Sequence, residues 1–325
     1  MRILLTGATG FLGNNLLRIL LESGHKVQVL MRSGVGNGAL AGLNFEAVDG
    51  DLSRPDSLLH GAVVFDVLIH SAAIIQIGWS KLAESKIVNV EATERLAEIC
   101  RLHGRKMIHV STVDTLAHSI DGSLLTEKDR EPRNPPCSYV VTKTEAEVRV
   151  QKQIALGLDG IIVHPGFMIG PFDWKPSSGK LILSVAKSWI PFAPAGGFSV
   201  VDVRDVADGI IRAISRGKSG ESYILGGENM TYLDLWQRIA KVVGRRGPRL
   251  RLPNRFAKFS GRVGNLYGRL SGQEPAINSA STAMGQLKHY YSSAKAESEL
   301  GYHIGSVDDA IHDAWNWLVA NKGRR

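Results

Sequence analysis

Cysteine is scarce in this chain: Cys100 and Cys137 are the only two among 325 residues, and they form no C-x-x-C pair. This scarcity argues against a disulfide framework and a cysteine-ligated zinc site, so we expect no metal centre and a reducing compartment. Apolar runs of membrane-spanning length, about 20 residues, are also missing. The chain opens with a short apolar run and glycines instead of the features of a secretory signal. These absences favour a globular protein of the cytoplasm.

Acidic residues are absent from the segment 245–272, although the whole chain has 31 of them. The same segment holds eight basic residues, which equals the formal net charge of +8 of the whole chain. No nucleic-acid-binding motif accompanies this charge, and we expect no nucleic-acid partner. Three explanations stay open for the segment: a solvated face, a site for an anionic substrate, or contact with an anionic lipid surface.

Within this basic segment, apolar residues recur at helical spacing from 254 to 270. The expected arrangement is a helix that turns this apolar side towards the core of a small lobe. A peripheral membrane contact through residues 245–270 is the alternative, because basic amphipathic helices lie on anionic membranes. The recurring apolar residues are Phe256, Phe259, Val263, Leu266 and Leu270.

Glycines interrupt the start of the chain at positions 7, 10 and 13, between a short apolar run and an apolar helical pattern. A strand that ends in glycines and continues as a helix leaves main-chain N–H groups at the helix terminus, which suits a phosphate. We expect Gly7 to form the bend, Gly10 to let the backbone approach a ligand, and Gly13 to let helix and strand pack closely. The sequence therefore predicts a phosphate-binding βα turn.

A second predicted strand, Lys26–Met31, completes a βαβ unit of about 30 residues. Dinucleotide sites select their cofactor at the end of this strand. An acidic residue there binds the ribose of NAD, and an arginine accepts the 2′-phosphate of NADP. Arg32 follows the strand here, and no acidic residue does. We therefore favour NADP(H) as the cofactor, with NAD(H) as the alternative.

Two further predicted strands, Phe45–Val48 and Phe65–His70, are followed by residues suited to a ligand. Asp51 comes after the first, where a carboxylate either accepts a hydrogen bond from an adenine amine or caps a helix. The small residues Ser71–Ala73 come after the second and leave room at the edge where open α/β sheets bind ligands. Apolar residues within 74–79 follow and form either core or the wall of a substrate pocket.

A tyrosine and a lysine four positions apart, Tyr139 and Lys143, open a predicted helix and share one of its faces. A nearby ammonium group favours the phenolate and lowers the pKa of a tyrosine, which is ordinarily about 10. The predicted strand Lys106–Val110 is followed by Ser111 and Thr112, and a hydroxyl there can orient a substrate oxygen. Together these residues predict a proton-transfer unit for a carbonyl/alcohol pair, with hydride moving to or from a nicotinamide.

These motifs resemble those of the extended short-chain dehydrogenases/reductases. Within that family the chain looks most like the group of dihydroflavonol reductases, 3β-hydroxysteroid dehydrogenases and hopanoid-associated sugar epimerase-like proteins. The likeness extends over roughly residues 1–230 and keeps the order of the family's motifs. The matching stretches are Thr6–Gly13, Gly50–Leu52, His70–Ala73, Val110–Thr112, Tyr139–Lys143, His164–Pro171 and Val201–Ala207.

The resemblance implies an α/β fold, a Rossmann-type doubly wound parallel sheet with a smaller, discontinuous α/β substrate lobe. It implies residues 1–164 and 199–217 in the NADP-binding domain, and residues 165–198 and 218–325 in the substrate lobe. It also makes a homodimer an expectation.

The family pattern makes Thr112, rather than Ser111, the catalytic hydroxyl, with Tyr139 as the acid/base and Lys143 as its partner. The residues expected at the cofactor are Gly7, Gly10, Phe11, Leu12, Gly13, Arg32, Asp51, Leu52, Ser71, Ala72, Ala73, Val110, Tyr139, Lys143, Pro165, Gly166, Phe167 and Met168. Those expected at the substrate are Ile74, Trp79, Thr112, Val113, Tyr139 and Phe167.

The chain departs from the sugar-nucleotide dehydratases of this family, in which an acidic residue follows the catalytic threonine. Here Val113 follows Thr112 and Asp114 comes one position late, which argues against dehydration. The leading hypothesis is an NADP-dependent oxidoreductase that interconverts a ketone or aldehyde and a secondary alcohol. A nucleotide-sugar epimerase that keeps its cofactor bound is the alternative, and a non-catalytic dinucleotide-binding protein is the third.

Overall fold

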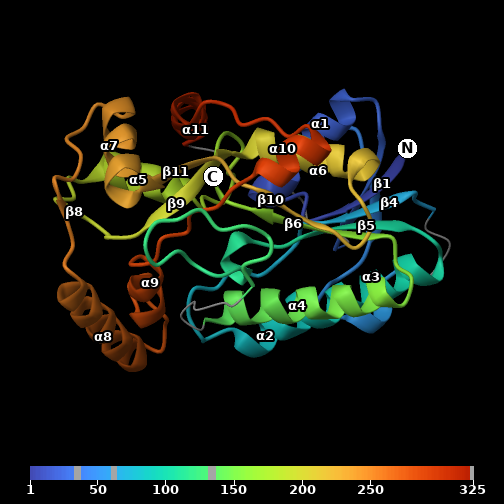
Figure 1. Ribbon diagram of the computed structural model, residues 1–325, viewed down its shortest axis with the longest axis horizontal. Helices are drawn as coiled ribbons and strands as arrows, with labels where there is room; N and C mark the ends of the chain where they lie inside the picture. Colours follow the sequence, from blue (N-terminus) through green and yellow to red (C-terminus); the bar gives the residue numbers. More distant parts are fainter. Residues whose placement is uncertain (33–37, 60–63, 131–136, 323–325) are drawn as a thin grey trace.

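A seven-stranded parallel sheet forms the centre of the computed structural model, which describes residues 1–32, 38–59, 64–130 and 137–322 (Figure 1). The strand order is β10-β6-β5-β4-β1-β2-β3, and every neighbouring pair is parallel. The strands are β1 (Arg2–Thr6), β2 (Lys26–Met31), β3 (Glu46–Asp49), β4 (Val67–His70), β5 (Lys106–Val110), β6 (Gly160–Pro165) and β10 (Ser222–Leu225). The doubly wound parallel sheet predicted from the sequence is confirmed.

The strand order reverses between β1 and β4, because the chain builds outward through β2 and β3 and then restarts on the other side of β1. Open α/β sheets bind ligands at such a reversal, outside the carboxyl ends of the strands. The two segments approach closely there: a Cβ atom on Gly7 would lie 2.8 Å from the main-chain nitrogen of Ala72. Gly7 also has a φ of +79°, a conformation that suits glycine. The first glycine of the motif therefore lies where a ligand is expected.

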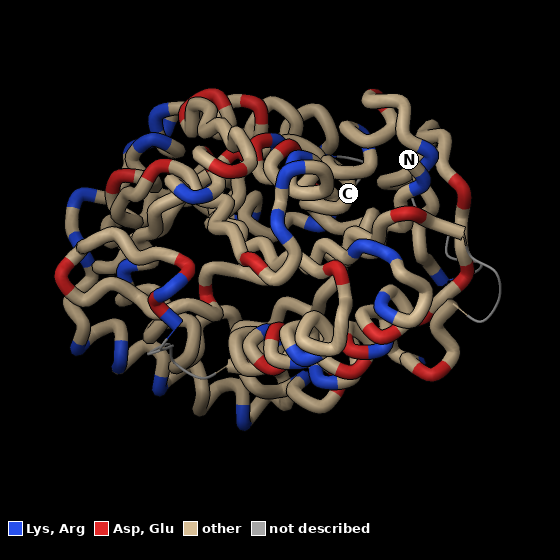
Figure 2. Tube along the Cα trace, turned by 45° about the vertical axis from the view of Figure 1, so that its right-hand side comes forward, with Lys and Arg blue, Asp and Glu red and all other residues tan. Residues whose placement is uncertain are grey.

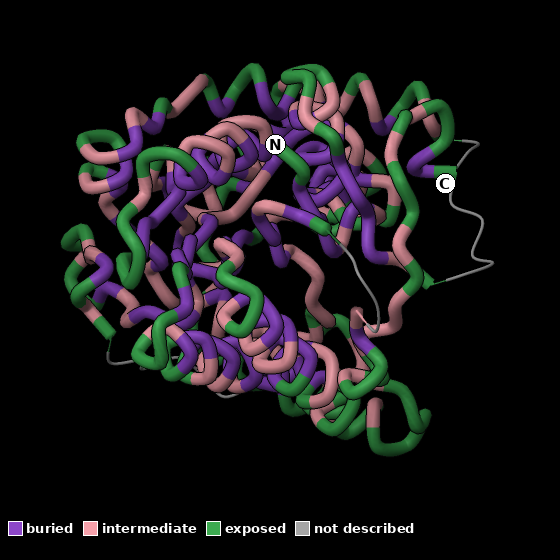
Figure 3. Tube along the Cα trace, turned by 90° about the vertical axis from the view of Figure 1, so that its right-hand side faces the viewer, coloured by how far each residue is buried: buried purple, intermediate pink, exposed green. Residues whose placement is uncertain are grey.

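Helices cover both faces of the sheet (Figure 1). α1 and α6 pack together on one face with α10 beside α6, and α3 and α4 pack on the other. Buried positions gather around the sheet between these layers, and exposed ones lie on the outer turns (Figure 3). The helices are α1 (Phe11–Glu22), α3 (Ala92–Leu102), α4 (Ser138–Ala155), α6 (Val203–Arg216) and α10 (Ala294–Leu300).

A three-stranded sheet, β11-β9-β7, forms the smaller lobe together with three helices. The chain crosses from the large sheet to this one at Gly166, where a Cβ atom would lie 2.5 Å from the carbonyl oxygen of Ser199. The elements of the lobe are β7 (Phe167–Ile169), β9 (Gly197–Asp202), β11 (Glu228–Thr231), α5 (Gly179–Lys187), α7 (Tyr232–Val242) and α11 (Val307–Ala320).

The strand pairing corrects the domain boundaries expected from the sequence, in which 199–217 joined the cofactor domain and 218–325 the substrate lobe. β9 pairs with β7 and β11 in the small sheet. β10 pairs with β6 at the edge of the large sheet, and α10 packs on it. Short apolar runs predict both strands, but their partners are distant in the sequence and no local pattern identifies them.

α8 (Asn254–Ser271) and α9 (Ser279–Met284) form a helical pair that follows the short ladder of β8 (Phe192–Ala193) and β12 (Leu250–Arg251). The expectation that α8 turns its apolar side towards the core is wrong, because that side is exposed. In the part of the chain that the structure describes, no helix combines the length and apolarity that crossing a membrane would require.

Candidate active site

The glycine turn between β1 and α1 has the geometry of a phosphate site. Gly10 donates its main-chain N–H to the carbonyl of Gly7 at 2.8 Å, and a Cβ atom on Gly13 would lie 2.1 Å from the same oxygen. Among the described residues, no side chain caps the amino terminus of α1 and no acidic residue lies in its first turn. The N–H groups of that turn can therefore bind an anion. Phe11 and Leu12 belong to this turn, and the Leu12 side chain is buried in the core.

Arginines gather around Asp51 at the ends of β2 and β3. Hydrogen bonds from Ser53, followed by the charges of Arg32 and Arg54, hold the pKa of Asp51 below its ordinary value. The guanidinium of Arg54 lies 3.8 Å from the Asp51 carboxylate. Leu52, the other residue expected at the adenine, packs against the core. Two cations thus lie near the residue at which the adenosine end of a dinucleotide is expected.

The end of β4 is joined to β1 by side chains. Thr6 Oγ1 lies 2.7 Å from Nδ1 of His70, and the Ser71 hydroxyl donates to the carbonyl of Thr6 at 2.7 Å. Burial, followed by the charge of Lys143, lowers the pKa of His70 to about 3, so its imidazole is neutral. These contacts hold Ser71–Ala73, expected to leave room for the cofactor, beside the glycine turn.

Asn89 joins the loop after β4 to α4. It lies in a single π turn, Ile87–Glu91, between α2 (Leu82–Lys86) and α3, and it is buried. Its side chain accepts from the N–H of Ile74 at 2.8 Å and donates to the Ile74 carbonyl at 3.0 Å. It also donates to the Thr142 hydroxyl at 2.9 Å. Ile74, expected at the substrate, is therefore held through its main chain.

Thr112, Tyr139 and Lys143 converge at the carboxyl end of β5. Thr112 follows β5 directly, while Tyr139 and Lys143 lie one turn apart near the start of α4. The Thr112 hydroxyl lies close enough to Tyr139 to lower the pKa of its phenol. The Lys143 ammonium donates to the carbonyl of Val110 at 2.7 Å and lies 3.3 Å from Nε2 of His109. The structure thus brings together the three residues that were predicted from the sequence to be catalytic.

Burial governs the protonation of both α4 residues. It lowers the pKa of Lys143 to about 8, with Glu147 opposing, so the lysine keeps its charge at neutral pH. Burial raises the pKa of Tyr139 above its ordinary value, aided by the charge of Asp114 and opposed by the Thr112 hydroxyl, which corrects the lowered pKa expected from the neighbouring Lys143 ammonium. Tyr139 is therefore a protonated phenol, the form that can give a proton to a carbonyl oxygen.

Asp114 turns back towards Thr112 although it comes one position later than the acidic residue of dehydratases. The short η4 turn, Val113–Thr115, brings them together, and the Thr112 hydroxyl donates to the Asp114 carboxylate at 3.2 Å. Nδ1 of buried His289 lies 3.4 Å from the same carboxylate. Its late place in the sequence argued against dehydration, and the contact with Thr112 shows that the carboxylate nonetheless lies at the site.

Val113 packs instead into a buried cluster with Leu116, Ile224 and Tyr291. Its carbonyl accepts a hydrogen bond from the Tyr291 hydroxyl at 3.0 Å. Val113 is therefore held in the core by packing and by this hydrogen bond, and its expected contact with the substrate stays a prediction.

Aromatic side chains from the small lobe border Asp114. Pro165–Met168, expected at the nicotinamide, form the link from β6 into β7. Phe167 stacks on Phe198 with ring centroids 4.4 Å apart, and Phe198 contacts Tyr232 at 4.2 Å. The Phe198 ring also lies 6.3 Å, between centroids, from the ring of His289, whose Nδ1 is 3.4 Å from the Asp114 carboxylate. Burial and then the charge of Asp114 raise the pKa of Tyr232.

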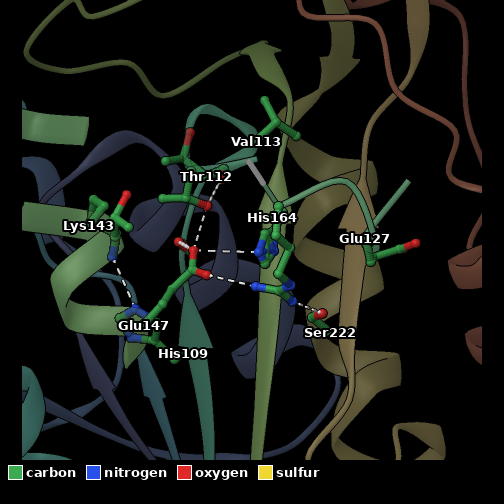
Figure 4. Close-up of polar contacts among 12 residues, drawn as sticks. His109, Thr112, Val113, Glu127, Lys143, Glu147, His164 and Ser222 are labelled. Atoms are coloured by element: carbon green, nitrogen blue, oxygen red, sulfur yellow. Dashed lines mark hydrogen bonds and ion pairs between the residues drawn. The ribbon is translucent and has the colours of Figure 1, made fainter. Parts of the chain in front are cut away.

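A buried carboxylate that the sequence analysis did not select, Glu147, points towards His164, whose Nε2 lies 3.5 Å from it (Figure 4). It accepts hydrogen bonds from Thr115, at 2.6 Å, and from Ser111. A guanidinium nitrogen of Arg130 lies 3.2 Å from its other oxygen. The Ser111 hydroxyl is thus used in a hydrogen bond to Glu147. The spacing does give a signal for this residue, because Glu147 lies four positions after Lys143 and therefore on the same helix face.

Three buried histidines, His70, His109 and His164, lie at or near the carboxyl ends of β4, β5 and β6. Burial lowers the pKa of His164 to about 4, with Glu147 opposing. Burial, aided by the charge of Lys143, also holds the pKa of His109 well below its ordinary value. All three rings are neutral at physiological pH, and the Lys143 ammonium lies beside this neutral group.

The loop that carries Trp79 is held between α4 and the segment after α8. The N–H of Trp79 donates to the Glu274 carboxylate at 2.8 Å, and the Gln76 amide donates to it at 2.7 Å. The carbonyl of Gln76 accepts from the N–H of Tyr139 at 3.2 Å. Trp79, expected at the substrate, has a side chain that is 45% exposed.

The model of the NAD dependent epimerase/dehydratase family matches residues 3–226. Sterol demethylase protein B of Methylococcus capsulatus is 31% identical over 322 residues, which cover 98% of each chain. The 4-hydroxy-2-methyl-3-oxo-4-farnesyl-3,4-dihydroquinoline-1-oxide ketoreductase of Stigmatella aurantiaca is 28% identical and covers 93% of this chain and 92% of its own. The crystal structure of gox2253 superimposes with a TM-score of 0.83 at 34% identity, over 99% of this chain and 98% of that one. This chain therefore belongs to the NAD dependent epimerase/dehydratase family, the extended short-chain dehydrogenases/reductases.

Proposed function

We propose that this protein is an NADP-dependent oxidoreductase that interconverts a ketone or aldehyde and a secondary alcohol by hydride transfer. One observation carries the proposal: Thr112, Tyr139 and Lys143 meet at the end of β5, and a carbonyl 2.7 Å away holds the Lys143 ammonium. Family membership alone does not choose among reductases, epimerases and dehydratases. The intact acid/base group argues against a non-catalytic dinucleotide-binding protein.

The chain's own residues suit a dinucleotide. The uncapped first turn of α1 fits a pyrophosphate, and the close approach at Gly13 lets that turn lie against β1. Arg32 and Arg54, whose charges both act on Asp51, favour the extra phosphate of NADP over NAD. Bound there, the nicotinamide would give or accept the hydride.

The proton transfer follows from the protonation states of Tyr139 and Lys143 on α4. In the reducing direction Tyr139 gives its proton to the substrate oxygen, while the Thr112 hydroxyl hydrogen-bonds the same oxygen. The Lys143 ammonium stabilises the phenolate that remains. The raised pKa of Tyr139 supports reduction as the direction favoured at neutral pH.

An apolar, ring-bearing substrate fits the surroundings best. Phe167, Phe198 and Tyr232 form a continuous aromatic group next to Asp114. Aromatic faces of this kind pack against apolar and aromatic ligands. A nucleotide-sugar epimerase would use the same Thr112, Tyr139 and Lys143 but would need polar partners for a sugar, which this aromatic group does not supply.

Net consumption of cofactor tests the proposal. Purified protein, NADPH and a panel of aryl and alicyclic ketones are expected to give a fall in absorbance at 340 nm that is matched by alcohol formed. An epimerase would regenerate its cofactor and show no fall. Tyr139→Phe should keep NADPH binding and lose about 100- to 10,000-fold in turnover. The exposed Tyr267→Phe serves as the matched control, and undiminished turnover in Tyr139→Phe would refute the assignment.

A further inference from the structure

α8 exposes a continuous apolar side. Six residues on it are between 50% and 81% exposed, although large apolar side chains are more often buried. Five of them recur every three or four positions and Tyr267 follows one of these directly, so the six form one stripe along the whole helix. The residues are Phe256, Phe259, Val263, Leu266, Tyr267 and Leu270.

The opposite side of α8 is fixed against the protein through glycines. A Cβ atom on Gly264 would lie 1.8 Å from the carbonyl oxygen of Ile277, and one on Gly261 would lie 2.3 Å from the Thr282 hydroxyl. Gly268 approaches Pro275 in the same way, at 2.9 Å. The helix therefore cannot rotate to bury its apolar stripe without breaking this contact.

A stripe of cations runs beside the apolar one. Arg255, Lys258, Arg262 and Arg269 each precede an apolar residue of the stripe by one position, so they are rotated by about 100° around the helix. No acidic residue occurs between 245 and 272. In Figure 2 the lower left edge of the molecule, where α8 lies, carries blue positions and no red ones.

A cavity of about 260 Å³ lies between α8 and α9 on the cationic side. Lys258 and Arg262 line it together with the hydroxyl-bearing Ser279 and Thr282. The two cations and the Ser279 hydroxyl match the oxygens of a phosphate group, whereas the Thr282 hydroxyl donates to the carbonyl of Asn278 at 2.9 Å.

We propose that α8 docks on an anionic lipid surface, with its apolar stripe in the acyl region and its cations at the phosphates. A basic amphipathic helix with aromatic and leucine residues on its apolar side lies in the plane of such an interface. A second copy of the chain is a less suitable partner for this stripe, because pairing two apolar stripes would bring two cationic stripes close together. The proposed docking does not depend on which reaction the active site performs.

Docking would bring the catalytic end of the protein near the bilayer. α9 lies between α8 and the start of α4, and its Ala280 packs in a cluster with Cys137 and Val140. Tyr139 contacts the same cluster. A lipid-facing α8 would therefore stand one helix away from the candidate acid/base residue.

Vesicle sedimentation of the full chain tests the proposal. Vesicles of phosphatidylcholine with about a third phosphatidylglycerol should pellet the protein, and pure phosphatidylcholine vesicles should pellet at least tenfold less. Binding should weaken as salt is raised, because the Debye length shortens. Equal or negligible binding to the two compositions would overturn the proposal.

Variants separate the two stripes. Arg262→Gln with Arg269→Gln should lower the partition coefficient about fivefold per charge, whereas Lys26→Gln with Lys152→Gln, exposed elsewhere, should leave it unchanged. Phe259→Ser and Leu270→Ser should each lower it about tenfold, and the exposed Ile120→Ser should not. Unchanged thermal unfolding would show that the variants stay folded. Equal losses in test and control variants would contradict docking through α8.

A single fluorophore reports whether the stripe enters the bilayer. Both native cysteines are buried, so Leu266→Cys can be labelled selectively with an environment-sensitive dye, and Ile120→Cys provides the control. Anionic vesicles should shift the emission of the 266 label to the blue and leave the 120 label unchanged. The alternative is that a second copy of the chain covers the stripe. In that case the emission of the 266 label would shift to the blue at high protein concentration without vesicles, and sedimentation equilibrium would give a larger mass. That result would overturn the proposal.

Discussion

The Lys143 ammonium donates to the main-chain carbonyl of Val110 at 2.7 Å, in a buried position beside the neutral ring of His109. This contact fixes the position of the charge at the end of β5. Burial lowers the pKa of Lys143 from 10.5 to about 8, and Glu147 offsets only part of that effect. Between these two values, the folded protein binds fewer protons at this site than the unfolded chain does.

The free energy of unfolding should therefore rise with pH above about 8. Stability increases with pH wherever the unfolded state binds more protons, and the Lys143 contribution amounts to about 2 kcal/mol between pH 7.5 and 9.5. Urea unfolding at both pH values measures it. Lys143→Met removes the titrating group, and the difference between wild type and this variant isolates the lysine from other groups. A difference that does not change with pH would contradict the lowered pKa.

Asp114 should control the protonation of Tyr139. Its charge contributes, after burial, to the raised pKa of the phenol. In Asp114→Asn the tyrosine should lose its proton more readily, so the pH of half-maximal kcat/KM for alcohol oxidation should fall by about one unit. The pH–rate profile measures this shift, and Asp121→Asn, in an exposed turn, should leave it unchanged. Identical profiles for wild type and Asp114→Asn would show that the two residues are not coupled.

The sequence predicted the central sheet well because its strands are short apolar runs with clear ends. Lys26–Met31 and Lys106–Val110 are found as predicted. It did not predict which sheet Ser222–Leu225 joins, because strand pairing depends on contacts distant in the sequence. It also predicted the α8 helix but not its orientation. Periodicity defines two sides of a helix without saying which is packed, and here the glycine side is the packed one.

In the candidate site, too, residues with a local sequence signal could be predicted, and residues positioned by the folded chain could not. Thr112, Tyr139 and Lys143 could be selected because each has a local signal, the end of a strand or a spacing of four. Asp114 could not be placed, since a single tight turn decides whether its carboxylate faces Thr112. Glu147 had a usable signal in its spacing from Lys143.

Glu147 should contribute to stability through its pair with Arg130. Its carboxylate accepts two hydroxyl hydrogen bonds and lies 3.2 Å from the guanidinium. Glu147→Gln leaves Arg130 without its charge partner and turns an amide donor towards hydroxyls, which should cost about 2 kcal/mol. Urea unfolding measures this cost. Glu84→Gln, in a surface pair with Lys81, should cost less than about 1 kcal/mol and is the matched control.

A double-mutant cycle attributes the Glu147 effect to the pair. If Arg130→Gln and Glu147→Gln act through their mutual contact, the double variant should be less destabilised than the sum of the single ones. Strict additivity would show that Glu147 stabilises the fold through the Ser111 and Thr115 hydroxyls alone.

Arg32 should select the cofactor. It follows β2 and is exposed, and its charge acts on Asp51 together with that of Arg54. Arg32→Ala should weaken NADPH binding by about 10- to 100-fold, because a charge-assisted contact to the 2′-phosphate is lost, and should leave NADH binding almost unchanged. Fluorescence titration with both cofactors measures the ratio. Arg54→Ala, whose side chain is 77% exposed, tests whether the second arginine shares this role and should have a smaller effect. If NADPH and NADH binding were weakened equally, Arg32 would contact the adenosine without contacting the 2′-phosphate. The preference for NADP would then have to come from other residues.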